Sequence, residues 1–557
     1  MAGCKGLEVV PLLRRIAEQA AAANPRAVVE SCSSSSSEGG ASFQTLSYKD
    51  LLGNVQTLSA QIESLLNGRS EGLPLHVAYL VNPSFEYAVT ELSVWGAGAT
   101  CVPLSVHSPV PELEYFVEDS ESALLIADTA SAPKMRAVAE KFGRPFAIIS
   151  VDKATMSASL TIEGTDCSKP GSNTPTLESS ALILYTSGTT GKPKGVVHTF
   201  ASLTAQYESL SEAWKWTSKD YTLHVLPLHH IHGVQNILNT ALFNGAGVEF
   251  TAFDAAFCLK RLCSGDITCF HAVPTIYVKF TQCIEKMSDA DVKETREGLR
   301  NPALRYMVSG SAALPVPTMK SWADISGHVL LERYGMTEIG MGLSNMIDGT
   351  KYPGCVGWAL PKVEVKPDED GAILIKGPCV FKEYYKRPEA TQKEFTADGW
   401  FRTGDSCQVG GQPEELQALQ DAAIEVDAAT HRPRSDISKT AAPELAGIHR
   451  IMGRTSVDII KSGGYKLSAL EIESTLLQHP AIKECAVVGK PDETWGEKVT
   501  AVCVLSGDLT IKELREWGKE RMASYKVPQE LVVVESLPRN QMGKLEKKKV
   551  VESFKNA

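Results

Sequence analysis

The chain has 557 residues, of which 43% are hydrophobic and 22% charged, and its formal net charge is −10. This length exceeds what a single hydrophobic core supports, so at least two domains are expected. The acidic balance argues against a surface that binds nucleic acid or anionic membranes, so an acidic substrate has to be attracted by locally placed cations. The thirteen cysteines form no C-x-x-C pair, which indicates reduced thiols rather than a disulfide framework or a zinc site.

The first part of the chain alternates short apolar runs with helical patterns. A helical pattern at 10–23 starts so early that it leaves little room for a cleavable signal, and another covers 85–95. The apolar runs expected to be strands are 76–81, 99–105, 123–128 and 146–151. This alternation is typical of βαβ units, so it predicts an α/β fold built around parallel sheets. Two polar segments, 31–40 and 165–176, are expected to be loops.

No apolar run reaches the roughly 18 residues that a membrane span requires. We therefore expect no membrane span and no nucleic-acid partner, and small molecules as the binding partners. The expected compartment is the cytoplasm, with the mitochondrion as the alternative.

A cluster of small residues, hydroxyls and lysines follows an apolar run at 180–185. It reads Thr186-Ser187-Gly188-Thr189-Thr190-Gly191-Lys192-Pro193-Lys194. Glycines allow the backbone N–H groups to approach an anion, hydroxyls donate hydrogen bonds or bind Mg²⁺, and lysine supplies charge. The cluster therefore predicts a phosphate-binding loop, although it lacks the G-x-x-x-x-G-K-[ST] spacing of the common nucleotide-binding loop. The alternative is a flexible surface turn.

Residues 184–195 resemble the signature of the acyl-adenylate-forming enzymes, which include acyl-CoA synthetases, luciferases and peptide-synthetase adenylation domains. Further segments resemble the same family in chain order: Tyr334-Gly-Met-Thr-Glu338, Phe401-Arg-Thr-Gly-Asp405, and the P-x-x-x-x-G-K frame from Pro538 to Lys544. The resemblance implies a large N-terminal domain, 1–453, of parallel and mixed sheets with flanking helices. It also implies a small mobile α+β lid domain, 454–557.

The resemblance also assigns roles at the nucleotide. The implied ATP and AMP contacts are Thr186, Ser187, Gly188, Thr189, Thr190, Lys194, Tyr334, Gly335, Thr337, Asp405 and Arg454. In the family the tyrosine ring stacks on the base, the aspartate binds the ribose hydroxyls, and Mg²⁺ is held by residues that correspond to Thr190 and Glu338, a hard oxygen ligand.

The remaining implied roles concern the reaction and CoA. Lys544 corresponds to the catalytic lysine, which stabilises charge during adenylation. Its alternative is one more lysine in a basic tail. We assign His230 to the carboxylate entrance, and Gly463, Gly464 and Tyr465 to the tunnel that receives CoA. The hinge between the domains is expected within 455–458.

The acid pocket is where the sequence becomes specific. Arg333 precedes the Tyr-Gly-Met-Thr-Glu motif, and a guanidinium facing an apolar acyl chain would be buried without a partner. Facing a second carboxylate, it would form a charge-assisted fork. His232, Lys279 and Ser311 lie in segments that the family uses for the same pocket. The alternatives are that Arg333 pairs with Glu332 or another acid on the surface, and that Lys279 is a solvated helix residue.

This polar set resembles malonyl-CoA synthetases, most closely the eukaryotic branch. The implied reaction joins malonate to CoA with ATP, through an acyl-adenylate and with release of pyrophosphate and AMP. The rivals are a CoA ligase for methylmalonate or another short-chain acid, a luciferase-type oxidative second step, and an inactive scaffold. A metal site formed by His229, His230 and His232 is disfavoured because no acidic or Cys partner is near in the sequence.

Residues 411–446 look inserted, because the family usually joins the segments around Asp405 and Arg454 by a short hairpin. We expect an exposed loop with a helical turn or two, since surface insertions cost little to close. The alternative is a partner-binding or regulatory surface.

Overall fold

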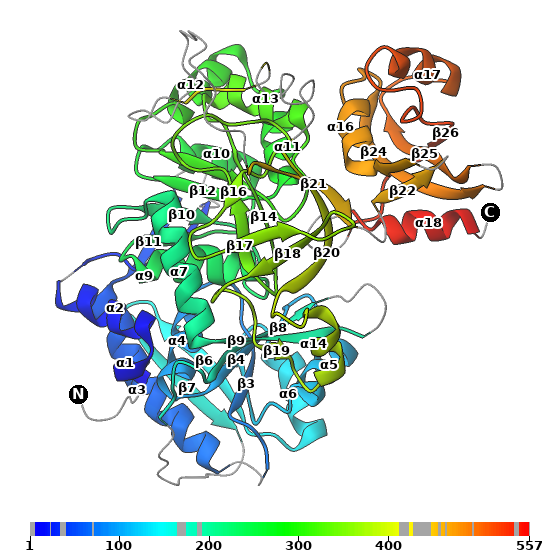
Figure 1. Ribbon diagram of the computed structural model, residues 1–557. Coiled ribbons are helices and arrows are strands. Elements are labelled where there is room, and N and C mark those ends of the chain that lie inside the picture. The colour runs from blue at the N-terminus through cyan, green and yellow to red at the C-terminus, as the bar shows by residue number, and fades with distance from the viewer. Residues whose placement is uncertain are drawn as a thin grey trace.

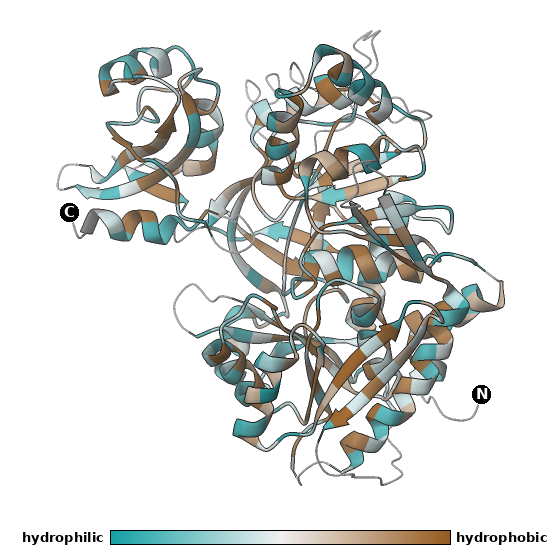
Figure 2. Cartoon of the chain, turned by 180° about the vertical axis from the view of Figure 1, so that it is seen from behind, coloured by the Kyte–Doolittle hydropathy of each residue, from teal (hydrophilic) through white to brown (hydrophobic). Residues whose placement is uncertain are grey.

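The computed structural model confirms the α/β class and shows a large body with a smaller C-terminal unit beside it (Figure 1). The structure describes residues 6–22, 24–33, 41–68, 72–163, 174–186, 192–410, 421, 423–426, 447–454, 458–462, 465–492, 495–539 and 545–555. In these ranges, no helix is both long and apolar enough to cross a membrane. Figure 2 shows apolar strands in the interior, with helices that turn their hydrophilic sides outward.

The first large sheet has eight strands in the order β19-β9-β8-β4-β3-β5-β6-β7. They are β3 (His76–Leu80), β4 (Thr100–Pro103), β5 (Leu124–Asp128), β6 (Phe146–Asp152), β7 (Ser157–Glu163), β8 (Ser180–Thr186), β9 (Lys194–Thr199) and β19 (Glu383–Tyr384). The parallel strands β3 to β6 are connected by α4 (Phe85–Gly96), α5 (Val110–Asp119) and α6 (Ala132–Phe142). This arrangement confirms the alternation that the sequence predicts.

The N-terminal helices are α1 (Gly6–Val9), α2 (Pro11–Ala21) and α3 (Tyr48–Asn67). The start of α3 is fixed by a reciprocal cap. The Ser47 hydroxyl accepts from the Asp50 amide, and the Asp50 carboxylate accepts from the Ser47 amide. Both donors would otherwise be unpaired at the helix end.

The second large sheet has nine strands in the order β16-β15-β14-β13-β12-β10-β11-β1-β2. They are β1 (Val28–Ser33), β2 (Ala41–Leu46), β10 (Tyr221–His224), β11 (Gly247–Phe250), β12 (Cys269–Ala272), β13 (Tyr306–Ser309), β14 (Leu331–Met336), β15 (Gly340–Ser344) and β16 (Trp358–Ala359). Its helices are α7 (Phe200–Trp214), α8 (Ile231–Gly233), the π-helix η1 (Val234–Asn239), α9 (Thr240–Phe243), α10 (Ala255–Leu262), α11 (Pro274–Ile284), α12 (Asp289–Leu299) and α13 (Val316–Ser326).

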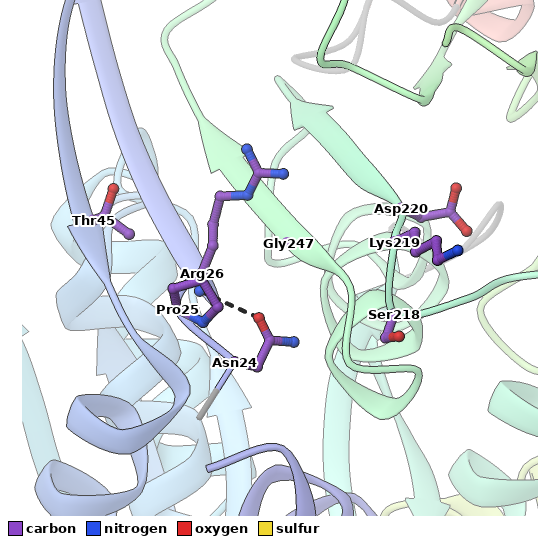
Figure 3. A pocket seen from close by; sticks show the side chains of 8 residues that line it. All are labelled: Asn24, Pro25, Arg26, Thr45, Ser218, Lys219, Asp220 and Gly247. Carbon is purple, nitrogen blue, oxygen red and sulfur yellow. Dashed lines mark hydrogen bonds between the residues drawn. The ribbon is translucent and has the colours of Figure 1, made fainter. Parts of the chain in front are cut away.

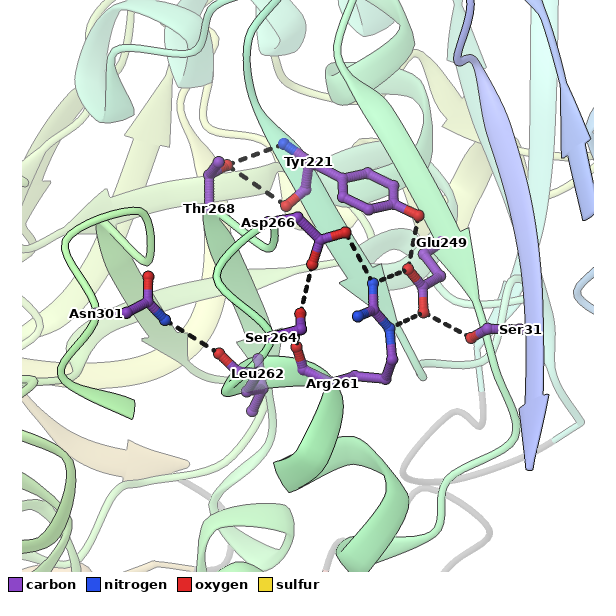
Figure 4. Close-up of polar contacts among 9 residues, drawn as sticks. All are labelled: Ser31, Tyr221, Glu249, Arg261, Leu262, Ser264, Asp266, Thr268 and Asn301. Carbon is purple, nitrogen blue, oxygen red and sulfur yellow. Dashed lines mark hydrogen bonds and ion pairs between the residues drawn. The ribbon is translucent and has the colours of Figure 1, made fainter. Parts of the chain in front are cut away.

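The loop expected at 31–40 is wrong for its first three residues, because Ser31 to Ser33 pair with β2 as part of β1. A buried network explains why this polar segment is ordered (Figure 4). Glu249 of β11 is fully buried and accepts hydrogen bonds from Ser31 at 2.6 Å and from Tyr221 at 2.6 Å. Arg261 completes the set as a two-pronged donor at 2.7 Å to each oxygen. The carboxylate is thus fully paired, as a buried charge requires.

A four-stranded sheet follows, in the order β17-β18-β20-β21. Its strands are β17 (Glu364–Pro367), β18 (Ala372–Lys376), β20 (Phe401–Val409) and β21 (His449–Arg454), and α14 (Pro388–Glu394) lies between β19 and β20 in the chain. β20 and β21 are antiparallel, with Asp405 opposite Arg454. The two strands on either side of the insertion are therefore paired with each other.

The C-terminal unit has its own five-stranded sheet, in which β26 joins the order β23-β22-β25-β24 beside β25. The strands are β22 (Ile459–Ser462), β23 (Tyr465–Ser468), β24 (Ile482–Asp492), β25 (Gly496–Leu505) and β26 (Glu530–Val533), and the helices are α16 (Ala469–Leu476), α17 (Ile511–Lys519) and α18 (Lys547–Lys555). A separate apolar cluster that includes Ile460, Ile472 and Val487 forms its core.

Part of the predicted insertion packs against the body. Ile424 and Lys351 form a two-residue antiparallel bridge with both backbone hydrogen bonds at 2.9 Å. Val426 is only 8% exposed and belongs to the core beneath β12 and β13. An exposed loop is therefore wrong for these residues, because their apolar side chains find a place in that core. Most of 411–446 lies outside the described residues.

Candidate active site

The candidate site lies at the carboxyl ends of the parallel strands of the second sheet. The segment after β10 carries the three histidines, and Ser311 follows β13. Arg333 is on β14 itself. In open α/β sheets this edge is where ligands bind.

Arg333 is a buried cation without an acidic partner among the described residues. The residue is only 4% exposed, and its Nη2 donates a hydrogen bond to the Ser311 hydroxyl at 3.1 Å. Within the described part of the chain, its Nε has no hydrogen-bond partner. Burial lowers the pKa of the Arg333 guanidinium to about 9, because desolvation disfavours its charged form.

The alternative that Arg333 pairs with Glu332 on the surface is wrong. Neighbouring residues of a strand point to opposite faces, and Glu332 is itself buried and accepts from the Leu314 amide at 3.4 Å. Burial raises the pKa of Glu332 to about 7. The two side chains therefore belong to different faces of the sheet.

Gly310 and Ser311 shape the space around the guanidinium. A Cβ on Gly310 would lie 2.2 Å from the Arg333 Nε, so only glycine leaves room for this arginine conformation. Ser311 has a left-handed φ of +67°, which is uncommon for a residue with a side chain. Its hydroxyl lies between Arg333 and His232, whose Nδ1 is 3.2 Å away.

His232 is buried and held neutral. Burial, followed by the positive charge of Arg333, keeps its pKa well below the ordinary histidine value. Its Nε2 has no partner among the described residues. The structure thus brings together three of the four predicted acid-pocket residues: Arg333, Ser311 and His232.

Lys279 does not join this group in the same way. Its side chain is exposed on α11, and its Nζ lies 5.4 Å from the ring centroid of Phe253. This position favours the alternative that Lys279 is a solvated helix residue. A role for Lys279 in acid binding stays a prediction.

His230 is half-buried beside His229, with 4.2 Å between the ring centroids. Burial lowers the pKa of His230 to about 4, so the ring is neutral at physiological pH. A neutral imidazole can donate and accept one hydrogen bond each. Its predicted role at the carboxylate entrance is compatible with this state and stays a prediction.

Two of the phosphate-loop residues stand at strand ends, because Thr186 ends β8 and Lys194 begins β9. Thr186 pairs with Lys194 across the hairpin, while Ser187, Gly188, Thr189 and Thr190 lie outside the described residues. The Lys194 ammonium is 3.8 Å from the ring centroid of Tyr384.

Glu338 is 6% exposed, and its Oε1 accepts from the Tyr384 hydroxyl at 2.8 Å. Burial raises the pKa of Glu338, while the Tyr384 hydrogen bond and the charges of Arg454 and Lys194 oppose this rise. Sequence reasoning missed Tyr384, because nothing distinguishes it from its neighbour Tyr385 before the fold places it.

The nucleotide motif residues are paired with one another. The Tyr334 hydroxyl donates to Asp405 Oδ2 at 2.6 Å, and Arg454 Nε lies 2.9 Å from Asp405 Oδ1. Gly335 is required by a close approach, since a Cβ there would lie 2.1 Å from the Gly340 carbonyl oxygen. The Thr337 carbonyl lies 2.7 Å from His198 Nε2. The structure thus brings Tyr334, Asp405 and Arg454 into one chain of contacts.

Three of the residues predicted to bind CoA or to act in catalysis lie outside the described residues: Gly463, Gly464 and Lys544. Tyr465 is 53% exposed and stacks on Tyr525, with ring centroids 4.4 Å apart and the planes inclined by 5°. An exposed flat aromatic face of this kind can receive a ligand, but its predicted contact with CoA stays a prediction.

A separate hollow lies at the opposite ends of the strands (Figure 3). Its lining residues are Asn24, Pro25, Arg26, Thr45, Ser218, Lys219, Asp220 and Gly247. Asp220 Oδ1 accepts a hydrogen bond from Arg305 Nη2 at 2.8 Å, and the Arg26 guanidinium lies 3.6 Å from the centroid of the Tyr221 ring. Because it opens at the amino ends of β10 and β11, this hollow is not part of the candidate site.

Two known protein families match most of the chain. The family described as AMP-binding enzyme matches residues 17–385, and the family described as AMP-binding enzyme C-terminal domain matches residues 471–544. The chain is 39% identical to a mitochondrial malonate–CoA ligase of Mus musculus, over 86% of this chain and 81% of that protein. It is 38% identical to a malonate–CoA ligase of Arabidopsis thaliana, over 86% of this chain and 78% of that protein. ATP-bound MatB from Rhodopseudomonas palustris superposes with a TM-score of 0.76 at 29% identity, covering 98% of this chain and 99% of that chain.

Proposed function

The chain belongs to the AMP-binding enzyme family, and from that premise we propose that it is an ATP-dependent malonate–CoA ligase. ATP and CoA are its co-substrates, and malonyl-CoA, AMP and pyrophosphate are its products. In the first step a carboxylate oxygen of malonate attacks the α-phosphorus of ATP, and the bond to the β-phosphate oxygen breaks. In the second step the CoA thiol attacks the acyl carbon, and AMP leaves with the electron pair.

The observation that carries the choice of malonate is the buried Arg333. Among the described residues, no acid compensates its charge, and its Nε is unpaired. Leaving a buried cation in this state is costly, so the site is complete only when an anion enters. A dicarboxylic acid supplies one carboxylate for the reaction and a second for Arg333, whereas a monocarboxylic acid leaves Arg333 unsatisfied.

We assign the acid pocket to Arg333, Ser311 and His232, with Lys279 as a further candidate. The guanidinium binds the distal carboxylate in a charge-assisted contact, and the neutral imidazole of His232 adds a hydrogen bond. The contact between His232 and Ser311 supports this assignment, because it fixes the orientation of both side chains. His230 is assigned to the entrance of the reacting carboxylate.

We assign the nucleotide end to the residues of the phosphate loop and of the two following motifs. They are Thr186, Ser187, Gly188, Thr189, Thr190, Lys194, Tyr334, Gly335, Thr337, Asp405 and Arg454. Asp405 is the acceptor for the ribose hydroxyls, and Arg454 pairs with its carboxylate. Their 2.9 Å ion pair supports this arrangement.

Glu338 fits a divalent cation. Its carboxylate is buried, its pKa is raised by burial, and it has a tyrosine hydroxyl rather than a full positive charge as its close partner. Such a hard oxygen ligand suits Mg²⁺. Glu338 and the Thr190 hydroxyl would hold the ion beside the phosphates. When bound, Mg²⁺ supplies positive charge that stabilises the phosphate groups.

The catalytic machinery needs no protein nucleophile, because positioning and charge stabilisation suffice. We assign Lys544 to the charge that develops in the adenylation step, and Gly463, Gly464 and Tyr465 to CoA in the second step. This division of labour requires a C-terminal lid domain, 454–557, that turns relative to domain 1–453 about a hinge within 455–458. The change of sheet between β21 and β22 supports a boundary at this point.

For the compartment, we propose the mitochondrion rather than the cytoplasm. The support is that the Mus musculus relative is a mitochondrial enzyme. Fractionation of cells that express the tagged full-length protein tests this proposal, and recovery in the cytosolic fraction would contradict it.

The decisive experiment measures pyrophosphate release with malonate, methylmalonate, succinate, acetate and propionate, each with and without CoA. We expect malonate to give the highest kcat/KM, and formation of the thioester only when CoA is present. A preference for a monocarboxylic acid would overturn the proposal, because Arg333 would then have no ligand to bind.

A further inference from the structure

His271 of β12 is a buried histidine that sequence reasoning missed. It is fully buried, and neither ring nitrogen has a hydrogen-bond partner among the described residues. A neutral imidazole always carries one donor and one acceptor, so both remain unused in this state. Buried polar groups in proteins are rarely left without partners, and such a group points to a bound water or ligand.

The strand register places His271 on the same face of the sheet as Arg333. His271 pairs with Val308, and Val308 pairs with Leu331. Arg333 lies two residues beyond Leu331, and side chains two apart on a strand share a face. Arg333 therefore lies nearer the carboxyl ends of the strands, and His271 lies deeper on the same face.

His271 lies between His232 and three aromatic residues. Its ring centroid is 6.4 Å from that of His232. On its other sides it meets Trp214 at 5.1 Å, Trp216 at 5.8 Å and Tyr306 at 5.7 Å between ring centroids. All three aromatic residues are buried, so they separate the imidazole from solvent.

The charge state of His271 is defined by the same neighbours. Burial, then the positive charge of Arg333 and a smaller electrostatic effect of His224, lower the pKa of His271 to about 3. The ring is therefore neutral at physiological pH and adds no second cation to the pocket. It can donate a hydrogen bond to a carboxylate without competing with Arg333 for counter-charge.

We propose that His271 is a specificity-determining residue that forms the inner wall of the acid pocket and donates a hydrogen bond to the distal carboxylate, directly or through one ordered water. This inference rests on the proposed function, because it takes the acid bound by Arg333 to be a short dicarboxylate. Two consequences follow. The donor favours a second carboxylate, and the position of the ring limits how long the acid can be.

The test compares His271→Ala and His271→Gln with the wild-type enzyme on malonate, succinate and propionate. For His271→Ala we expect kcat/KM for malonate to fall at least about tenfold, mainly through KM. We expect propionate to change less than threefold, and the ratio of succinate to malonate activity to rise. His271→Gln keeps an N–H donor and should restore part of the malonate affinity.

A matched control is His76, a buried histidine of the other large sheet whose Nδ1 lies 2.7 Å from the Ser120 carbonyl oxygen. His76→Ala should lower stability without altering the preference among the acids. Calorimetric titration of malonate and propionate into each variant, together with its melting temperature, separates loss of binding from loss of folding. Equal losses for malonate and propionate in both His271 variants would overturn the inference.

The two proposals fail in different ways. If the wild-type enzyme prefers an acid other than malonate, the proposed function fails before any variant is made. If the wild-type enzyme prefers malonate but both His271 variants keep its KM within twofold and its ratio to succinate, only the role of His271 fails.

Discussion

The two ends of the candidate site, which meet at consecutive residues of β14, treat their polar groups in opposite ways. At the nucleotide end, Tyr334, Asp405 and Arg454 are paired with one another. At the acid end, atoms of Arg333, His232 and His271 are without partners among the described residues. The nucleotide end is therefore preorganised by internal pairing, while the acid end holds buried polar atoms that a bound acid can pair with. Selectivity for the acid should follow from the second arrangement, because the wrong acid leaves the same atoms unpaired.

The largest effect is expected from Lys544, which we assign to the adenylation step. Lys544→Ala should abolish adenylation, a loss of at least about 100- to 1,000-fold, because it removes charge stabilisation from the transition state. Thioester formation from preformed malonyl-adenylate should remain largely intact. Pyrophosphate release and single-turnover transfer to CoA measure the two steps separately. Comparable losses in both steps would contradict the assignment of Lys544.

The acid end is tested by Arg333→Ala. We expect kcat/KM for malonate to fall by a factor that corresponds to about 2–4 kcal/mol of activation free energy, the cost of removing one partner from a desolvated charge pair. Acetate and propionate should be affected much less, since they never use the contact. Arg333→Lys should recover only part of the loss, because a point charge replaces a fork. Equal losses for malonate and propionate would show that Arg333 supports the adjacent nucleotide motif instead.

The nucleotide end is tested by Asp405→Asn, which keeps the shape but removes the charge. We expect kcat/KM for ATP to fall by a factor that corresponds to about 1.5–3 kcal/mol of activation free energy, the range for hydrogen bonds to charged groups. In contrast to the Arg333 variants, the loss should be the same whichever acid is used. Steady-state kinetics with saturating malonate and then saturating propionate measure this. A loss confined to malonate would show that the two ends are not separate.

The opposite face of β14 gives a pH-dependent prediction. Burial raises the pKa of Glu332 to about 7, above its ordinary value of 4.5, so the folded state binds this proton more tightly than the unfolded state. The stabilisation is fully present below pH 4.5 and is lost as the pH rises through 7. Between pH 5 and 8 the wild type should lose about 2 kcal/mol of unfolding free energy relative to Glu332→Gln. Urea unfolding of both proteins across this range checks it, and parallel curves would rule out the buried proton.

The smallest effect is expected from shortening the insertion. Replacing 411–446 by a short turn should leave kcat/KM within about threefold, because long surface loops cost little to close. The contacts of Ile424 and Val426 sharpen this prediction. A second deletion that retains 423–426 should lower the melting temperature less than the full deletion does. Loss of activity in a variant that still unfolds cooperatively would show that the insertion contributes to binding or to the hinge.

The sequence predicts the elements of the first sheet well, because patterns such as 146–151 have the length and apolar content of a buried strand, and β6 covers Phe146–Asp152. It fails at Ser31 to Ser33, where polar residues form a strand because Glu249, far away in the sequence, supplies a buried acceptor. The acid pocket shows the same limit. Arg333 could be predicted from its place beside a motif. Nothing in the sequence distinguishes His271 from its neighbours in an apolar run, and only the register of three strands places it on the same face as Arg333.

The absent side chain of Gly310 has a consequence for how such enzymes diverge. A methyl group there would collide with the side chain of Arg333, which supplies the three atoms nearest to it, so the arginine could swing aside while the fold survived. An alanine at 310 would thus change which acid is accepted without altering a single group that binds the acid. When substrate preference is inferred for related sequences, an arginine at this position is informative only together with the glycine that leaves it room.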